Sequence, residues 1–360
     1  MQLLKKKSLP TATFIENSDA FLSIYRKAID QIPIVTEAKN KKNRCYVTSF
    51  MTQYILYTRE EVLKSPKYSI QQKQAAKYIS PFLLLIANVL LKQNITWINN
   101  NLTSTPLYNK NWDFYDIKKL TNQFLTHYPK DVIIYKSVEP QTNPVLFKKF
   151  VDKGYISVLG RQVYIFDPKS SKYKKKRSYQ IDKKLAEKQD QFFWTILDVD
   201  NQEEVKRVLE LYKELYLEKH SIYNPIYNET FIKNGFGNFK LRFEVLKDKY
   251  TKKIVAAQGI HETDRVINTS LIGYDQSLPQ KLGLYRLMNY ELMRQTIAKD
   301  KILNMSSGAG DFKLKRGGQN SFEYQMIYPG NLSTFQKKVW RFLANTLEKT
   351  AKQQMNDLRV

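Results

Sequence analysis

Val266-Ile-Asn-Thr-Ser-Leu-Ile-Gly-Tyr-Asp-Gln-Ser-Leu-Pro-Gln-Lys-Leu-Gly-Leu-Tyr-Arg286 is the stretch that decides the fold. Its apolar pattern over 266–274 predicts a strand, and the polar residues 275–280 predict a loop that ends next to Pro279. A helix is predicted over 284–298, directly after Gly283. The stretch therefore predicts a strand that is joined to a helix by a short loop with glycine at the junction.

The elements around this stretch come in a definite order. Before it, the sequence predicts an amphipathic helix over 203–219 and strands over 240–246 and 254–261, which are joined by the polar hairpin loop 247–253. After it come a strand over 301–305, a Gly/Ser turn, a strand over 322–328 and a final helix over 334–353. The first half mixes strand-like runs at 45–50, 131–135, 155–158 and 160–166 with helix-like runs at 70–79, 81–93 and 117–127. The chain is therefore predicted to be a mixed α/β (α+β) protein.

Two segments in the second half carry a resemblance to a known superfamily. Gln280-Lys-Leu-Gly-Leu-Tyr285 resembles the pyrophosphate loop Gln/Arg-x-x-Gly-x-Gly/Ala of the Gcn5-related N-acetyltransferases (GNAT), with Tyr285 in place of the last small residue. The segment 303–318, with the pair Phe312-Lys313, resembles the end of the acyltransferase domain in the FemAB and CelD-type branch, the BioF-like acetyltransferase domain. This branch implies two tandem GNAT-like domains, each a mixed twisted sheet flanked by helices. We expect them at 1–168 and 201–360, with a basic junction at 169–200.

The same resemblance implies a set of binding residues. Backbone N–H groups at a helix start bind phosphate, so the donor phosphates are expected at the loop and helix start formed by Gln280, Lys281, Leu282, Gly283, Leu284, Tyr285 and Arg286. The donor's pantetheine is expected in the gap between the strands 266–273 and 301–305. The implied substrate-binding residues are Ser306, Ser307, Lys313 and Arg316, which could also be turn residues or a solvated helix face. No metal is implied.

Four residues are candidates for acid–base chemistry. His261 lies near the end of a predicted strand, and imidazole titrates near neutral pH, but it could also face solvent. His220 follows the helix 203–219, where a histidine also suits the helix dipole without any catalytic role. Asp275 could accept the proton of an amine or serve as a loop cap. Tyr285, like Tyr274, could protonate the leaving thiolate or be a packing residue.

Composition excludes several classes of protein. The 360 residues contain one cysteine, Cys45, and three widely separated histidines, so neither an intramolecular disulfide nor a zinc-ligand spacing is available. No export signal is visible, which predicts a cytoplasmic protein. The longest apolar run, residues 81–91, is too short to span a bilayer and predicts a buried helix.

The charge of the chain indicates an anionic partner. Fifty-nine Lys and Arg residues against 34 Asp and Glu residues give a formal net charge of +25, and the sequence pI is about 9.7. The basic cluster 172–177 is interleaved with tyrosine. It could be a solvated loop, a patch for peripheral binding to an anionic membrane face, or a nucleic-acid contact.

These observations predict an N-acyltransferase that uses acyl-CoA, or an acyl carrier thioester, as its co-substrate. The acceptor would be a primary amine of a small molecule or lipid precursor, which attacks the thioester directly. One alternative is an aminoacyl-tRNA-dependent, FemX-like peptidyltransferase, for which the positive charge would serve tRNA binding. The other is a non-catalytic GNAT-fold scaffold that binds nucleic acid or membrane.

Overall fold

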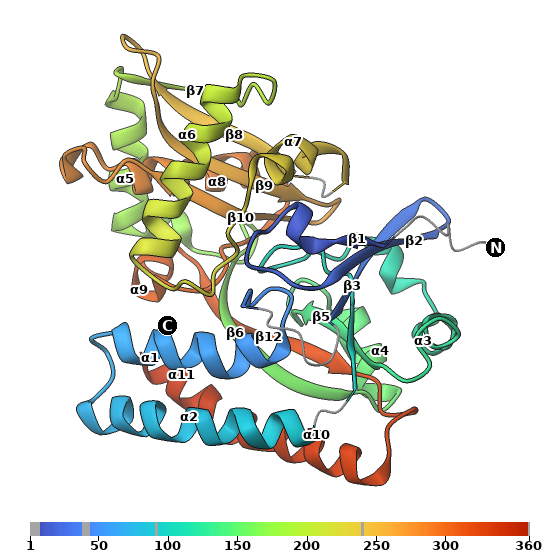
Figure 1. Cartoon of the computed structure of the whole chain (residues 1–360). Coiled ribbons are helices and arrows are strands. Elements are labelled where there is room, and N and C mark those ends of the chain that lie inside the picture. The colour runs from blue at the N-terminus through green and yellow to red at the C-terminus, as the bar shows by residue number, and fades with distance from the viewer. Residues whose placement is uncertain (1–7, 38–43, 91–92, 239–240, 359–360) are drawn as a thin grey trace.

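The computed structural model describes residues 8–37, 44–90, 93–238 and 241–358. Within these residues, twelve strands form one sheet in the order β1-β2-β3-β4-β5-β12-β6-β11-β10-β9-β8-β7. Helices cover the sheet, and a group of them lies along one edge of the molecule (Figure 1). The predicted mixed α/β class is confirmed.

The described elements have the following bounds. The strands are β1 Leu9–Pro10, β2 Phe21–Lys27, β3 Asp30–Glu37, β4 Ile95–Ile98, β5 Val132–Val138, β6 Ile156–Phe166, β7 Phe192–Ile196, β8 Leu241–Asp248, β9 Ile254–Glu262, β10 Val266–Tyr274, β11 Ile302–Asn304 and β12 Gln319–Ile327. The helices are α1 Thr58–Lys64, α2 Ile70–Leu90, α3 Ile117–Leu125, α4 Pro144–Asp152, α5 Arg177–Lys188, α6 Gln202–Lys213, α7 Glu229–Asn238, α8 Leu284–Ala298, α9 Gly310–Leu314, α10 Thr334–Thr346 and α11 Lys352–Leu358. Short π-helical segments are η2 Thr52–Tyr57, η5 Glu214–Glu218 and η7 Leu347–Ala351.

The sheet is nearly symmetric about its centre. Each half contains a parallel pair, β4 with β5 and β10 with β11, among otherwise antiparallel neighbours. At the centre, β6 and β12 pair antiparallel along their length, from Gln319 opposite Ile165 to Ile327 opposite Ile156. β12 thus lies between β5 and β6 of the first half, while β6 lies between β12 and β11 of the second. The two halves exchange strands, and the division into 1–168 and 201–360 stays a prediction.

The hydrophobic core also joins the halves. One buried cluster contains Val35 and Trp97 from the first half together with Val205 and Leu271 from the second. Burial of this shared apolar surface stabilises the halves against separation. A cavity at the junction therefore has walls that are held by one common core.

In the second half, the predicted bounds of the strands and helices agree closely with those of the structure. β10 and α8 have the predicted bounds, and β8, β9, β11 and β12 lie within about three residues of theirs. The predicted helix 203–219 is α6 continued by η5, and residue 240 of the predicted strand 240–246 lies outside the described residues. In the first half, the strand predicted at 45–50 is wrong, because Thr48 N–H and Ser49 N–H both donate to Cys45 O and close a turn.

The prediction of a buried helix at 81–91 is also wrong. Residues 70–90 form the single helix α2, which continues through Pro81, and residue 91 lies outside the described part of the chain. Phe82 is 61% exposed and Leu85 is 64% exposed. The physical reason is that α2 packs with one side on α1 and η2, which leaves its other side facing outward.

Candidate functional site: a tyrosine-lined cavity at a gap between parallel strands

The gap predicted between the two parallel strands is present. β10 and β11 pair from Val266 opposite Ile302 to Asn268 opposite Asn304. Beyond that point, β10 continues to Tyr274 along β9. The segment that follows β11 turns toward β6 instead, where Met305 N–H donates to Tyr164 O. The strands therefore separate after Asn268, and in the described part of the chain no strand pairs with the rest of β10 on that side.

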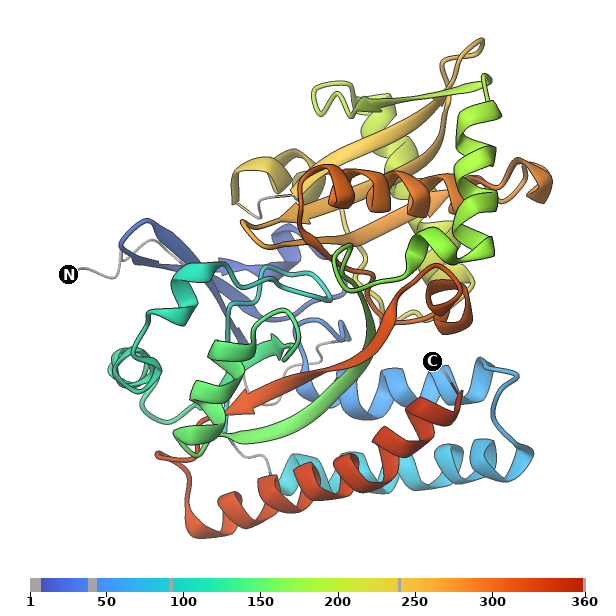
Figure 2. The same ribbon diagram turned by 180° about the vertical axis from the view of Figure 1, so that it is seen from behind.

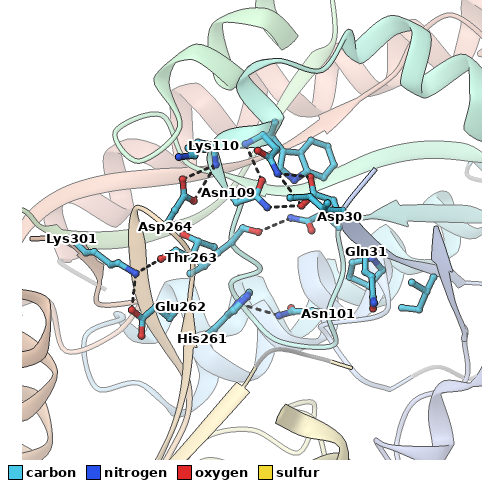
Figure 3. A pocket seen from close by; sticks show the side chains of 17 residues that line it. Asp30, Gln31, Asn101, Asn109, Lys110, His261, Glu262, Thr263, Asp264 and Lys301 are labelled. Atoms are coloured by element: carbon cyan, nitrogen blue, oxygen red, sulfur yellow. Dashed lines mark hydrogen bonds and ion pairs between the residues drawn. The ribbon is translucent and has the colours of Figure 1, made fainter. Parts of the chain in front are cut away.

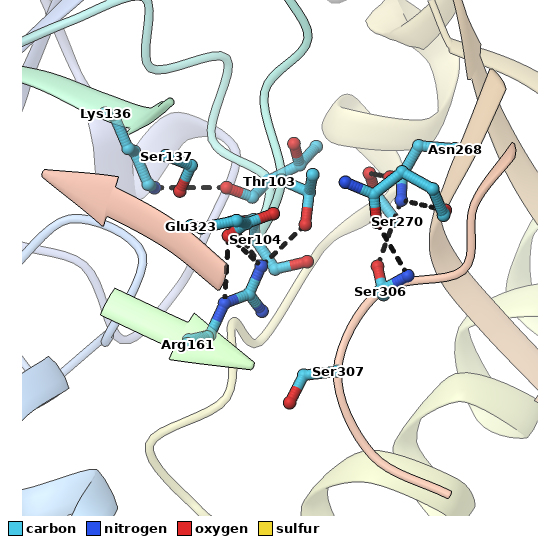
Figure 4. Close-up of polar contacts among 12 residues, drawn as sticks. Thr103, Ser104, Lys136, Ser137, Arg161, Asn268, Ser270, Ser306, Ser307 and Glu323 are labelled. Atoms are coloured by element: carbon cyan, nitrogen blue, oxygen red, sulfur yellow. Dashed lines mark hydrogen bonds and ion pairs between the residues drawn. The ribbon is translucent and has the colours of Figure 1, made fainter. Parts of the chain in front are cut away.

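Asn268 fixes the point of separation. Its side-chain amide donates to Asn304 O at 2.8 Å and to Ser306 Oγ at 3.0 Å, and it is fully buried (Figure 4). Its Oδ1 accepts a hydrogen bond from Ser270 Oγ at 2.8 Å. These bonds hold the start of the loop 306–309 against β10.

A cavity of about 340 Å³ opens at this gap and is built by both halves of the chain. Its walls are unusually rich in tyrosine: Tyr46, Tyr57, Tyr212, Tyr216, Tyr227, Tyr274 and Tyr285. Tyr212 and Tyr216 stack with ring centroids 4.9 Å apart, and Tyr46 and Tyr57 lie 4.5 Å apart. Such rings provide apolar walls with polar hydroxyl tips, which suits a substrate of mixed character.

The loop 306–309 and Lys313 form one side of the cavity. Ser306, Gly308 and Ala309 all have positive φ, of 59°, 78° and 51°. Lys313 Nζ holds this strained loop by donating to Ser306 O at 3.0 Å and to Ser307 O at 2.8 Å. Burial, with a smaller contribution from the Arg161 cation, lowers the pKa of Lys313 to about 7. Lys313 can therefore exchange a proton near neutral pH.

Arg161 on β6 supplies the opposite side. Its guanidinium donates to Glu323 Oε2 at 2.8 Å, to Thr105 Oγ1 at 2.6 Å and to Ser104 O at 3.0 Å (Figure 4). Glu323 is fully buried, so this is an ion pair held away from water. The pair fixes Ser104 and Arg161 at the cavity wall, and both residues come from the first half.

The matching gap in the first half is filled. β4 and β5 pair up to Ile98 opposite Tyr135, and the next residue of β5 is the buried Lys136. Lys136 Nζ donates to Val47 O at 2.6 Å, to Asn100 Oδ1 at 3.1 Å and to Thr103 O at 3.1 Å. Burial, and secondarily the Arg161 cation, lowers the pKa of Lys136 to about 7. Of the two related gaps, the one in the second half is open.

The predicted phosphate loop is covered by the basic junction. Gly283 has φ 66° and caps α8, but a Cβ there would lie 2.7 Å from Leu185 of α5. Asp182 of α5 is buried and accepts a hydrogen bond from Arg286 Nε at 2.6 Å and another from Arg316 Nε. Helix α5 thus occupies the corner at the start of α8 (Figure 2).

The other residues predicted for this loop lie as follows. Gln280 and Lys281 are exposed, Leu282 is half-buried and Leu284 is buried in the core. Tyr285 points its ring toward the cavity, 5.9 Å from the ring of Tyr274 and 4.8 Å from Phe312. The structure therefore brings one of the seven loop residues, Tyr285, to the cavity wall.

Of the remaining predicted site residues, four line the cavity: His220, Ser306, Ser307 and Lys313. His220 lies on the rim, where its pKa is lowered, first by partial desolvation of its ring against the protein and then by the cations of Lys219 and Lys64. A neutral imidazole at this position can accept a proton. Arg316, in contrast, is bound to Asp182 behind the site.

Two predicted catalytic residues lie away from this cavity. Asp275 binds Arg207 at 2.7 Å and accepts hydrogen bonds from Ser277, so it acts as a loop cap. His261 is buried at the floor of another cavity, of about 600 Å³, where its Nδ1 is 3.3 Å from Asn101 Nδ2 (Figure 3). Amides and carboxylates such as Asn109, Glu262 and Asp264 line that cavity. The roles predicted for His261 and Asp275 stay untested.

Sequence reasoning missed the contributions of the first half. Tyr46, Tyr57, Ser104 and Arg161 reach the cavity because β6 is inserted beside β11. No local pattern signals this, since the exchange of strands depends on pairing between distant segments. The 24 tyrosines of the chain were the one available signal.

Comparison with known proteins places the fold. No family model and no curated protein sequence matches the chain. Among solved structures, the C-terminal domain (DUF2156) of a protein from Agrobacterium fabrum assigned as a lysylphosphatidylglycerol synthetase has a TM-score of 0.50 at 10% identity, covering 96% of this chain and 94% of that one. Two further solved structures are similar. L-PGS from Bacillus licheniformis is 17% identical with a TM-score of 0.42, and the match covers 63% of this chain and 77% of that one. FemX is 9% identical with a TM-score of 0.47, and the match covers 66% of this chain and 81% of that one.

The class of fold follows from the first of these likenesses. At 10% identity it shows the architecture alone, and it extends over nearly the whole of both chains. The chain therefore shares the fold of that domain, a mixed sheet with two similar halves flanked by helices, which is the architecture that the resemblance of 280–285 and 303–318 implied.

Proposed function

We propose that this chain is an acyltransferase whose reaction takes place in the tyrosine-lined cavity. The observation that carries the proposal is the open gap between β10 and β11, which is lined by Lys313 and by the loop 306–309. Unpaired strand backbone on one side and a buried cation on the other can hold an acyl group in a fixed orientation. Fixed orientation of two reactants accelerates their reaction strongly.

The chemistry needs one proton acceptor and one proton donor. A primary amine or hydroxyl of the acceptor attacks the carbonyl carbon of the donor ester or thioester, and its proton passes to a base. We propose His220, which lines the cavity, as this base. The bond from that carbon to the leaving oxygen or sulfur then breaks, and the leaving atom takes a proton. We propose that Lys313 stabilises the negative charge on oxygen and donates this proton, since its ammonium has three donors and uses two of them to hold the loop, which leaves the third for the substrate.

The covered phosphate corner bears on the choice of donor. If acyl-CoA, the donor first expected from 280–285, bound as the resemblance implies, its diphosphate would lie at the start of α8, where α5 packs through Leu185 and the ion pairs of Asp182. We therefore favour the alternative donor, an aminoacyl ester of tRNA, which reacts at its terminal ribose and has no diphosphate to seat there. The net charge of +25 suits a polyanionic donor. The name of the similar synthetase suggests a lysyl or other aminoacyl group and a lipid acceptor.

The experiment compares two donors and two lysine variants. The protein is incubated with a lipid extract and either labelled aminoacyl-tRNA or labelled acyl-CoA, and transfer of label to the acceptor is measured. Lys313→Met should lower transfer by on the order of a hundredfold or more. Lys315→Met, at an exposed position at the end of the same helix, should leave it unchanged.

The outcomes separate the hypotheses. Transfer from aminoacyl-tRNA that depends on Lys313 supports the proposal, whereas Lys313-dependent release of free CoA thiol would restore acyl-CoA as the donor. If neither donor is consumed while the folded protein still binds tRNA or vesicles, the non-catalytic scaffold becomes the better description.

A further inference from the structure

The outer side of α2 carries an apolar stripe. Tyr78, Phe82 and Leu85 follow one another at spacings of four and three residues, which places them on the same side of the helix. Tyr78 is 71% exposed, in addition to the exposed Phe82 and Leu85. An exposed row of large apolar side chains is unfavourable in water and indicates a surface that is covered in the working protein.

Helix α10 presents a second stripe of the same kind. Phe335 is 59% exposed and Phe342 is 72% exposed, and their spacing of seven residues places both on one side of the helix. Trp340 on the opposite side is buried, with its ring 4.9 Å from that of Phe50. The helix is therefore anchored through its inner side while its outer phenylalanines are free to contact something else.

Both helices carry only positive charge. α2 contains Lys73 and Lys77, and α10 contains Lys337, Lys338 and Arg341. Neither helix contains an aspartate or a glutamate. On α10, the exposed Lys338 and Arg341 lie next to the exposed phenylalanines, so apolar and cationic groups share the same outer surface.

The two helices lie along the same edge of the molecule. Figures 1 and 2, which show opposite sides, both place α2 and α10 at the edge farthest from β7 and β8. α2 packs its inner side on α1 and η2, and α10 packs on β6. Gln336 of α10 donates to Gln93, just beyond the end of α2, at 2.8 Å, so the two helices are neighbours at this edge. We call the outer sides of α2 and α10 together the basal surface.

We propose that this basal surface docks on an anionic lipid bilayer. Exposed aromatic and aliphatic side chains enter the boundary between headgroups and acyl chains, while lysine and arginine side chains bind lipid phosphates. A nucleic acid would satisfy the cations but would leave Phe82, Leu85 and Phe342 in water. Within the described residues, no helix is long and apolar enough to cross a membrane, so α2 and α10 lie on the bilayer rather than span it.

Docking in this way would place the bilayer close to the tyrosine-lined cavity. The docking proposal itself does not depend on the acyltransferase reaction proposed above. η2 and α1, which separate α2 from the sheet, supply Tyr57 and Glu61 to the cavity wall. A bilayer at the basal surface would therefore lie beside the side of the cavity that these helices form. A lipid-borne acceptor could then reach the site without leaving the membrane.

The test measures binding to vesicles by co-sedimentation. Full-length protein is mixed with vesicles of phosphatidylcholine containing phosphatidylglycerol, and separately with vesicles of phosphatidylcholine alone. We expect binding to the anionic vesicles that weakens as salt is added. The double variant Phe82→Asp with Phe342→Asp should bind them at least tenfold more weakly, and Lys338→Glu with Arg341→Glu should lose the preference for anionic lipid.

The matched control is Phe114→Asp. Phe114 is 81% exposed, more than either target, and it lies next to η3 (Lys110–Asp113), away from the basal helices. This variant should bind anionic vesicles as the unmodified chain does. Since all these positions are exposed, each variant should keep its thermal unfolding transition.

Three results would overturn the proposal. The first is equal vesicle binding by the Phe82/Phe342 variant and the Phe114 variant. The second is a dimer in solution, seen without lipid, that dissociates on Phe82→Asp. The third is tRNA binding that the Phe82/Phe342 variant loses while vesicle binding persists. The last two would assign the surface to a second copy of the chain or to nucleic acid.

Discussion

Gly273→Ala should destabilise the protein by about 2–3 kcal/mol, because α6 crosses β10 at this glycine. A Cβ at position 273 would lie 2.5 Å from the carbonyl carbon of Leu211, 2.6 Å from Tyr212 N and 2.7 Å from Leu211 O. Favourable contacts between carbon atoms begin at about 3.5 Å, so the helix has to move outward by roughly 1 Å. The clashing atoms belong to the backbone, which no change of rotamer can move away.

The displacement would also change the cavity. Tyr212 lies on α6 and Tyr216 on the turn that follows it, and both rings form part of the cavity wall. We therefore expect Gly273→Ala to lower transferase activity beyond the loss that its reduced stability explains.

Urea unfolding followed by circular dichroism measures the free energy of unfolding of this variant. The control is Gly237→Ala on α7, where a Cβ would meet nothing within 4 Å. Because alanine is a better helix former than glycine, the control should be unchanged or gain up to about 1 kcal/mol. Equal free energies of unfolding for the two variants would refute the contact between α6 and β10 as described.

Two further predictions concern buried charges. Asp182→Ala should lower the free energy of unfolding, measured with urea, by about 3 kcal/mol, since it leaves the guanidinium groups of Arg286 and Arg316 without their carboxylate. The control Asp152→Ala, which breaks an exposed ion pair with Lys148, should lower it by less than about 1 kcal/mol. Equal losses in the two variants would contradict the buried pairing. The second prediction concerns Lys136, whose pKa is lowered in the folded protein from the ordinary value of 10.5 to about 7. Between these pH values the unfolded chain binds a proton at Lys136 that the folded chain does not. The free energy of unfolding therefore rises with pH in this range. Lys136→Met should reduce that rise in the free energy of unfolding measured from neutral pH to about pH 10, and an unchanged slope would show that Lys136 is charged in the folded protein.

The second half of the fold could be predicted because its signals are local. Strand β10, the loop after it and helix α8 each follow from the apolar pattern of their own residues, and the order of elements indicated the fold. Five of the predicted site residues line one cavity, because they lie next to those elements in the chain: His220, Tyr285, Ser306, Ser307 and Lys313. Their roles stay predictions.

The rest depends on contacts between distant segments. Nothing near Arg161 indicates that β6 is inserted beside β11, so its place at the cavity wall could not be inferred. The burial of Gly283 under Leu185 likewise depends on where α5 packs. For residues 81–91, apolarity predicted burial, but a helix at the edge of a fold can keep an apolar side exposed.

The exchange of β6 and β12 has a consequence for how the molecule is made. While the chain emerges from the ribosome, β5 and β6 are synthesised early, but β12, residues 319–327, which lies between them in the sheet, is synthesised near the end. A nascent chain that stalls before that segment would expose two open strand edges, which are sites for chaperone binding or aggregation. Fragments cut at the basic junction should likewise be insoluble apart and recover their structure when they are refolded together.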